Sequence, residues 1–188
     1  LLGAGKMGGA MLEGWLKGGA DPRKIVAFDP APPPEMKALL ATHGIRLNPP
    51  VASIKDAEVL VIAVKPQLME EALPGIVPLK ASRPLVLSVA AGKTIAYFEA
   101  RFGADAAVVR TMPNTPAAVG RGITAMVTNP NVSAQQAELA RTLLGAEQER
   151  WLADGWDLAR PWNLIAQQTL MARFAWTDTA IGGGVYWT

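Results

Sequence analysis

The chain has 188 residues, half of them hydrophobic and 18% charged, so it can bury a sizeable core and is not expected to be disordered. The net charge is +2 and no cluster of basic and aromatic residues is present, which argues against nucleic-acid binding. Because cysteine is absent and His43 is the single histidine, disulfides, cysteine nucleophiles and a histidine metal site are excluded. No apolar run reaches the length of a membrane span and no signal peptide is visible, so we expect a cytoplasmic protein without a membrane partner.

Strand and helix patterns alternate along most of the chain. The runs "EVLVIAV" (58–64) and "PLVLSVAAG" (84–92) are almost fully apolar, which is typical of parallel strands covered on both faces. The other expected strands are 1–2 (the end of a first strand), 24–28, 45–47 and 106–110, and the expected helices are 7–17, 35–42 and 94–101. The alternation predicts an α/β fold of the Rossmann type, with a doubly wound parallel sheet.

The alternation continues to Trp151, after which the chain changes character. We expect a strand at 122–128, a helix from the capping box Ser133–Gln136 to Leu144, and a last strand at 147–152. Five of the six tryptophans lie at position 151 or beyond, a density that is typical of a partner surface. We therefore expect two parts, a first domain over 1–152 and a shorter region over 153–188.

Three glycines near the start, Gly3, Gly5 and Gly8, have the spacing G-x-G-x-x-G. After a strand and before a helix, this pattern cradles a pyrophosphate. Asp29 ends the second expected strand, where a carboxylate accepts hydrogen bonds from a ribose hydroxyl and repels a 2′-phosphate, which favours NADH over NADPH. Two alternatives remain open: the glycines make only a tightly packed turn, and Asp29 only begins a turn with Pro30.

Three further stretches follow expected strands and would meet at the same edge of the sheet. They are "AVKPQ" (63–67), "SVAAG" (88–92) and "RTMPNTPAAVG" (110–120). In the last of them, two prolines bracket Asn114 and Thr115, a rigid arrangement that suits the positioning of a planar ring or a small substrate. The alternatives are a solvated Lys65 and an ordinary turn in which Asn114 bonds its own backbone.

The motifs "GAGKMG", "AVKPQ", "SVAAGKT" and "RTMPNTPAAVGRGIT" occur in the order found in pyrroline-5-carboxylate reductases, so residues 1–152 resemble that family. The resemblance implies NADPH- or NADH-dependent reduction of the cyclic imine to L-proline, the last step of proline synthesis, by a homodimer or larger homo-oligomer. It implies cofactor contacts at Leu2, Gly3, Ala4, Gly5, Lys6 and Met7, at Ala63, Val64, Lys65 and Pro66, and at Val89, Ala90 and Ala91, with Asn114 near the nicotinamide.

The tail departs from this family. The segment "SGSGPAY", which opens the helical domain in such enzymes, is absent, and Val185 stands beside "GGG" (182–184) where a hydroxyl residue is expected. The resemblance implies a dinucleotide-binding Rossmann domain over 1–152 and, over 153–188, an incomplete or divergent remnant of a C-terminal helical dimerisation domain. No catalytic donor is assigned, and we expect the chain to be part of a longer protein. Two alternative functions remain: an oxidoreductase acting on another small imine or acid, and a dinucleotide-binding module without catalysis.

Overall fold

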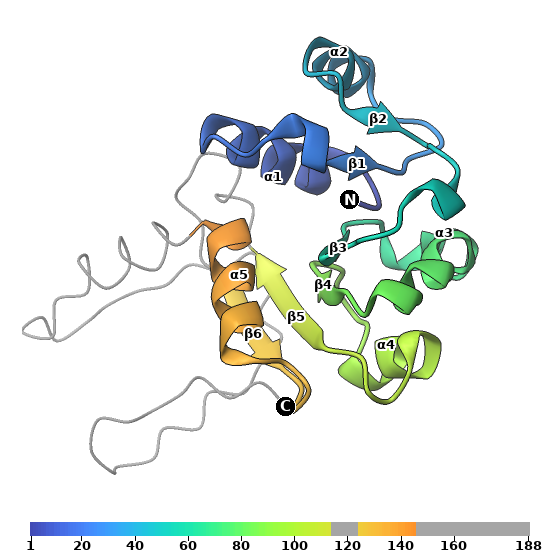
Figure 1. The fold of residues 1–188 in the computed structure, drawn as a ribbon, viewed down its shortest axis with the longest axis vertical. Helices are drawn as coiled ribbons and strands as arrows, with labels where there is room; N and C mark the ends of the chain where they lie inside the picture. The colour runs from blue at the N-terminus through green and yellow to red at the C-terminus, as the bar shows by residue number, and fades with distance from the viewer. Residues whose placement is uncertain (114–123, 146–188) are drawn as a thin grey trace, which may run out of the picture. The chain divides into compact units, whose positions relative to one another are not determined.

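The computed structural model describes residues 1–113 and 124–145 (Figure 1). The helices are α1 (Lys6–Lys17), α2 (Pro34–Thr42), α3 (Met69–Ile76), α4 (Ile95–Phe102) and α5 (Ala134–Leu144). The strands are β1 (Val26–Ala27), β2 (Arg46–Leu47), β3 (Val59–Ile62), β4 (Leu85–Ser88), β5 (Val108–Pro113) and β6 (Thr124–Thr128). The alternation predicted from the sequence is confirmed.

The strands form a largely parallel sheet. β1 pairs with β2, β3 with β4 and β4 with β5, all in parallel, and β6 adds to β5 in the antiparallel direction. Leu2 joins the two groups of strands because it bridges Phe28 on one side and Ile62 on the other. Its N–H donates to the Val61 carbonyl and its carbonyl accepts from the Ala63 N–H, both at 2.8 Å. The prediction that the first residues end a strand is confirmed, and the structure places this segment between the two groups of strands.

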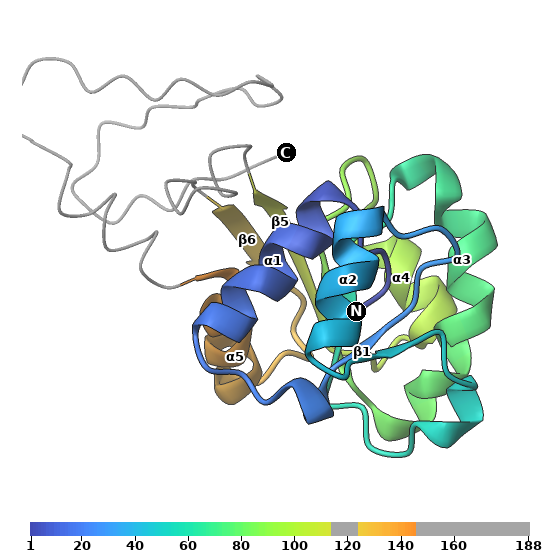
Figure 2. The same ribbon diagram turned by 90° about the horizontal axis from the view of Figure 1, so that it is seen from above.

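Helices cover both faces of the sheet (Figure 2). Successive residues of β3 point to opposite faces: Leu60 and Ile62 join the core beneath α3 and α4, whereas Val61 joins the core beneath α1 and α5. A third cluster, which contains Leu12 of α1 and Leu40 of α2, covers the end of the sheet that carries β1. Burial on both faces explains why β3 and β4 are continuous apolar runs.

Two elements differ from the sequence prediction. The run 84–92 is a strand only to Ser88, after which the backbone leaves the sheet and reaches a left-handed Gly92 at φ +68°. Helix α3 was not among the predicted elements, and its Pro74 lies exposed near the end of the helix. Met69, Leu73 and Ile76 recur at helical spacing and are all buried, which stabilises α3 despite the proline. The strand expected at 147–152 and the tryptophan-rich tail lie outside the described residues.

Candidate dinucleotide site

Four predicted segments lie at the carboxyl ends of neighbouring parallel strands. The glycine loop 3–8 follows the Leu2 segment, Asp29 follows β1 and its neighbour Phe28, residues 63–66 follow β3, and residues 89–91 follow β4. In open α/β sheets, ligands bind in the crevice outside this edge, at the point where the chain connections reverse direction. The Leu2 segment marks that point, since the next strands along the chain lie on one side of it and β3 on the other.

Two of the three motif glycines are required by packing. Gly3 has φ +89°, and a Cβ there would lie 2.9 Å from both the carbonyl carbon and the carbonyl oxygen of Ala63. A Cβ on Gly8 would overlap the carbonyl oxygen of Gly3 and would lie 3.1 Å from the Ala63 Cβ. The glycine loop therefore packs directly on the residues that follow β3, so tight packing, the simpler interpretation, accounts for Gly3 and Gly8.

Gly5 is different because packing does not require it. A Cβ on Gly5 would meet no atom of the described residues within 4 Å, and the backbone there is at φ −76°, which any residue can adopt. Gly5 is the N-cap of α1, with no side-chain cap and no acidic residue in the first turn. Open space over the uncapped first turn of a 12-residue helix leaves N–H groups available to an anion. These residues fit the pyrophosphate of a dinucleotide.

Asp29 is fixed at both carboxylate oxygens. Its Oδ2 accepts a hydrogen bond from the Ala4 N–H at 2.7 Å, and its Oδ1 accepts one from the Ala31 N–H at 2.9 Å. The second bond shows that Asp29 begins a turn, and the first ties this turn to the glycine loop. The side chain is only half-buried, and each carboxylate oxygen has two acceptor sites, so one site on each oxygen remains for a ligand.

The segment after β4 presents backbone rather than side chains. Val89 donates its N–H to the Ile62 carbonyl at 3.1 Å, and Ala90 is 4% exposed. The Ala90 carbonyl accepts a hydrogen bond from Nη2 of Arg110 in β5 at 3.1 Å. Burial lowers the pKa of the Arg110 guanidinium, and its Nε is buried and has no hydrogen-bond partner among residues 1–113 and 124–145. Arg110 thus adds a partly desolvated positive charge to this edge of the sheet.

The structure brings only some of the predicted cofactor-contact residues into contact with one another. The glycine loop, Asp29, Ala63 and Val64 are in direct contact through the packing and hydrogen bonds given above. Lys6 and Lys65 are exposed, which agrees with their simpler interpretation as solvated side chains. Asn114 lies outside the described residues. Sequence reasoning missed Arg110 and also Asn48, although the Asn48–Pro49 dipeptide is a turn signal that could have indicated the latter.

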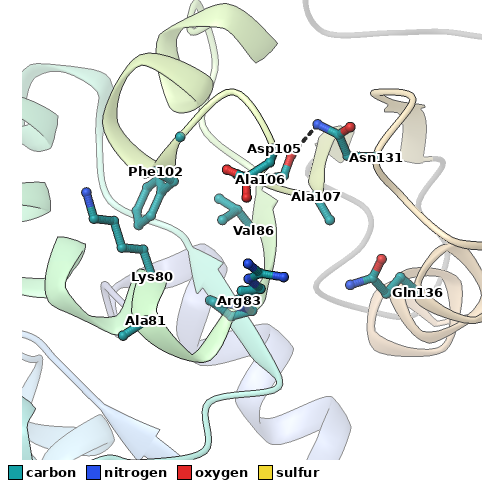
Figure 3. Close-up of a pocket in the computed structure, with 12 residues that line it drawn as sticks. Lys80, Ala81, Arg83, Val86, Phe102, Asp105, Ala106, Ala107, Asn131 and Gln136 are labelled. Carbon is teal, nitrogen blue, oxygen red and sulfur yellow. Dashed lines mark hydrogen bonds between the residues drawn. The ribbon is translucent and has the colours of Figure 1, made fainter.

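A separate hollow lies at the other end of the strands (Figure 3). It is lined by Pro84, directly before β4, and by Ala106 and Ala107, directly before β5, together with Lys80, Arg83 and nearby side chains. Because it lies at the amino ends of the parallel strands, it is distinct from the edge where dinucleotides bind. Within residues 1–113 and 124–145, no group of three His, Cys, Asp or Glu side chains could hold a metal, and no helix could cross a membrane.

Comparison with known proteins agrees with this geometry. A family model described as NADP oxidoreductase coenzyme F420-dependent matches residues 1–92. The pyrroline-5-carboxylate reductase of Pseudomonas aeruginosa is 35% identical over 147 residues, which are 77% of this chain and 53% of that protein. The chain belongs to the pyrroline-5-carboxylate reductase family. It spans about half the length of the curated relatives that it matches.

Solved structures show the same fold. A pyrroline-5-carboxylate reductase from Coxiella burnetii superimposes with a TM-score of 0.69 at 27% identity and covers 77% of this chain and 54% of that chain. The pyrroline carboxylate reductase of Plasmodium falciparum, solved with NADP bound, gives a TM-score of 0.64 at 23% identity, over 77% of this chain and 53% of that chain. The predicted Rossmann-like fold is confirmed, and the domain is an NAD(P)-binding domain.

A second family model, described as PhoD-like phosphatase, matches residues 80–187. This range overlaps the first match at 80–92 and includes β4, β5, β6 and α5, which complete the Rossmann-like sheet. The C-terminal part of this reductase-family chain therefore carries sequence typical of a second family as well. The predicted division into 1–152 and a helical remnant at 153–188 stays a prediction, because residues 146–188 lie outside the described residues.

Proposed function

We propose that this protein takes part in the NAD(P)H-dependent reduction of 1-pyrroline-5-carboxylate to L-proline. The observation that carries the proposal is the open space at Gly5, over the first turn of α1 and at the carboxyl edge of the sheet. The sequence and fold of the chain match reductases of that name. Family membership supports the reaction, and the fit of the glycine loop to a pyrophosphate supports the cofactor. The substrate, the homo-oligomeric assembly and the cytoplasmic location belong to the same proposal.

When bound, the reduced nicotinamide supplies a hydride to the carbon of the protonated C=N bond, which yields the ring amine and the oxidised cofactor. The described residues contribute binding and orientation. The N-terminal turn of α1 would hold the pyrophosphate, and the backbone at 63–66 and 89–91 would line the rest of the site. A protonated imine is already electrophilic, so the reaction does not require an acid–base pair among these residues. No proton donor is assigned.

The test is oxidation of NADH and NADPH by the purified protein, with and without pyrroline-5-carboxylate, followed at the absorbance of the reduced nicotinamide. The proposal predicts substrate-dependent oxidation with proline as the product. The Gly5→Val variant tests the assigned site, because its branched side chain would fill the space at Gly5 and should abolish turnover. Cofactor binding without turnover would contradict the reductase function while leaving the dinucleotide site intact.

The second family match favours one alternative. The reductase match covers 77% of the chain, whereas the phosphatase model matches residues 80–187, so part of the chain is also similar to a different family. Under this alternative, the chain is a dinucleotide-binding module that does not reduce the imine. Binding of NADH with no oxidation in the presence of pyrroline-5-carboxylate, or of other small imines and 2-oxo acids, would support this alternative. Turnover of one of the other compounds alone would instead indicate a related oxidoreductase.

A further inference from the structure

Asn48, at the carboxyl end of β2, holds the backbone of Asp29 at the end of the neighbouring strand. Its Oδ1 accepts a hydrogen bond from the Asp29 N–H at 2.8 Å, and its Nδ2 donates one to the Asp29 carbonyl oxygen at 2.7 Å. The Asn48 N–H donates to the Ala27 carbonyl at 2.8 Å, which continues the pairing of β2 with β1. The amide side chain thus replaces a further pair of ladder bonds beyond the end of the two short strands.

The Asn48 backbone is in the left-handed region, at φ +49°. Only one other described non-glycine residue, Arg83, has a positive φ. Asparagine adopts this conformation more readily than most residues, but it still costs more there than glycine does. The bidentate contact with Asp29 offsets that cost, so the conformation of Asn48 and the position of Asp29 depend on each other.

The Asp29 carboxylate is oriented by the same network. With its backbone held by Asn48 and its two oxygens held by Ala4 and Ala31, the side chain cannot rotate without breaking hydrogen bonds of 2.7 and 2.9 Å. One acceptor site on each oxygen remains, and two adjacent acceptors match a vicinal diol. A 2′-phosphate would instead bring negative charge against a fixed carboxylate, in a loop whose next residues, 30–36, contain no cation.

We propose that Asn48 is a positioning residue for cofactor choice: by fixing Asp29, it makes the site select a free ribose diol, and hence NADH, over a 2′-phosphorylated ribose. The inference rests on the proposed function only in taking the ligand to be a nicotinamide dinucleotide. It extends the preference argued from Asp29 to a second residue, one that would touch no part of the cofactor. Asp29 carries the discrimination and Asn48 maintains it.

The experiment measures dissociation constants for NADH and NADPH by quenching of protein fluorescence, which requires no turnover. Asn48→Gly removes the amide but keeps a residue suited to φ +49°, so the backbone is not strained. Asp29→Ser removes the negative charge of the carboxylate. Asn131→Ala is the matched control. The Asn131 amide also donates hydrogen bonds to backbone carbonyls, those of Ala104 and Ala106, but it lies at the opposite end of the strands. Thermal unfolding of each variant reports the effect on the fold.

The unmodified chain is expected to bind NADH at least tenfold more tightly than NADPH. Asn48→Gly should weaken NADH binding about tenfold with little change for NADPH, and Asp29→Ser should remove the preference. Asn131→Ala should leave the ratio unchanged even if it lowers the unfolding temperature. An unchanged ratio in Asn48→Gly, while Asp29→Ser shifts it, would overturn the role of Asn48.

Equal affinities in the unmodified chain would overturn the inference as a whole but would leave the proposed function standing. If neither NADH nor NADPH binds, the proposed function is overturned, and the inference with it. The two failures are therefore distinguishable in one set of titrations.

Discussion

Gly8 in α1 packs against the carbonyl oxygen of Gly3 so closely that any Cβ on Gly8 would overlap that oxygen. The contact joins the first turns of α1 to the strand segment before them and presses both against Ala63. We predict that Gly8→Ala forces the loop and helix apart and lowers the free energy of unfolding by about 2 kcal/mol, as overpacking of a dense contact does. Urea denaturation measures the loss.

Gly14→Ala is the matched control for that prediction. Gly14 lies in the same helix, and a Cβ there would meet no atom within 4 Å, so the alanine adds only helix propensity. We expect Gly14→Ala to raise the free energy of unfolding by roughly 0.5–1 kcal/mol. A destabilised Gly14→Ala, or an unaffected Gly8→Ala, would contradict the packing described for the glycine loop.

Gly5→Ala separates ligand binding from folding. Because Gly5 has an extended backbone and open space around it, alanine is expected to change the free energy of unfolding by less than about 1 kcal/mol. The added methyl group would occupy the space assigned to the pyrophosphate, so the affinity for NADH should fall about tenfold or more. A titration of the variant checks this. If Gly5→Ala binds NADH as tightly as the unmodified chain does, the pyrophosphate lies elsewhere.

Trp15 connects the two helices that cover one face of the sheet. Its indole N–H donates a hydrogen bond to the carbonyl oxygen of Leu143, 2.7 Å away, near the end of α5. Trp15→Phe keeps an aromatic ring in the core but leaves that carbonyl without its partner, so we expect a loss of about 1 kcal/mol in the free energy of unfolding. Chemical denaturation of the variant measures it, and equal stability would show that the bond contributes nothing net.

Glu70 of α3 lies at the centre of an ionic network with α4. The hydrogen bond from Arg101, at 2.8 Å, and the hydrogen bond from the Tyr97 hydroxyl, at 2.8 Å, hold the pKa of the Glu70 carboxyl below its ordinary value. A carboxyl whose pKa is lower in the folded state stabilises that state above its unfolded pKa, near about 4.3, and loses this contribution as the pH falls through the folded value.

The pH dependence of Glu70→Gln tests this network. The unmodified chain should have a higher unfolding temperature than the variant at pH 7. The difference should begin to shrink as the pH falls below about 4.3, the unfolded pKa of glutamate, and should disappear once the pH is below the lowered folded pKa of Glu70. Because Glu70 is exposed, solvent and salt screen the network, so added NaCl should reduce the difference at pH 7. A difference that persists unchanged to pH 3 would contradict the assigned direction of the pKa.

Periodicity and caps predicted much of the fold from the sequence. The capping box of Ser133 and Gln136 forms as expected, and Thr94 caps α4 by accepting a hydrogen bond from the Tyr97 N–H. These signals are local, because a hydroxyl and a backbone N–H three residues apart need no tertiary context. The early glycine loop and the apolar runs of β3 and β4 were equally predictable, since sheet burial and the phosphate loop have distinct patterns.

The features that escaped prediction depend on contacts distant in sequence. Helix α3, which contains Pro74, was not predicted, and burial of Met69 and Leu73 against the sheet stabilises it. The role of Asn48 depends on the parallel pairing of β1 and β2, which places its amide beside Asp29, nineteen residues away. Arg110 could be recognised only once Ala90 was known to lie next to it. Secondary-structure propensity depends on residues that are close in sequence, whereas these side chains contact residues that are distant in sequence.

The most direct measurement is hydrogen–deuterium exchange of the whole chain with and without saturating NADH. A dinucleotide at the carboxyl edge of the sheet should slow exchange in peptides covering residues 2–9, 29–31, 63–65 and 89–92, because their N–H groups would contact the ligand or be shielded by it. Peptides around the hollow at the opposite end, 80–83 and 103–107, should be unchanged. Protection confined to that hollow, with exchange in the glycine loop unaffected, would contradict the proposed dinucleotide site.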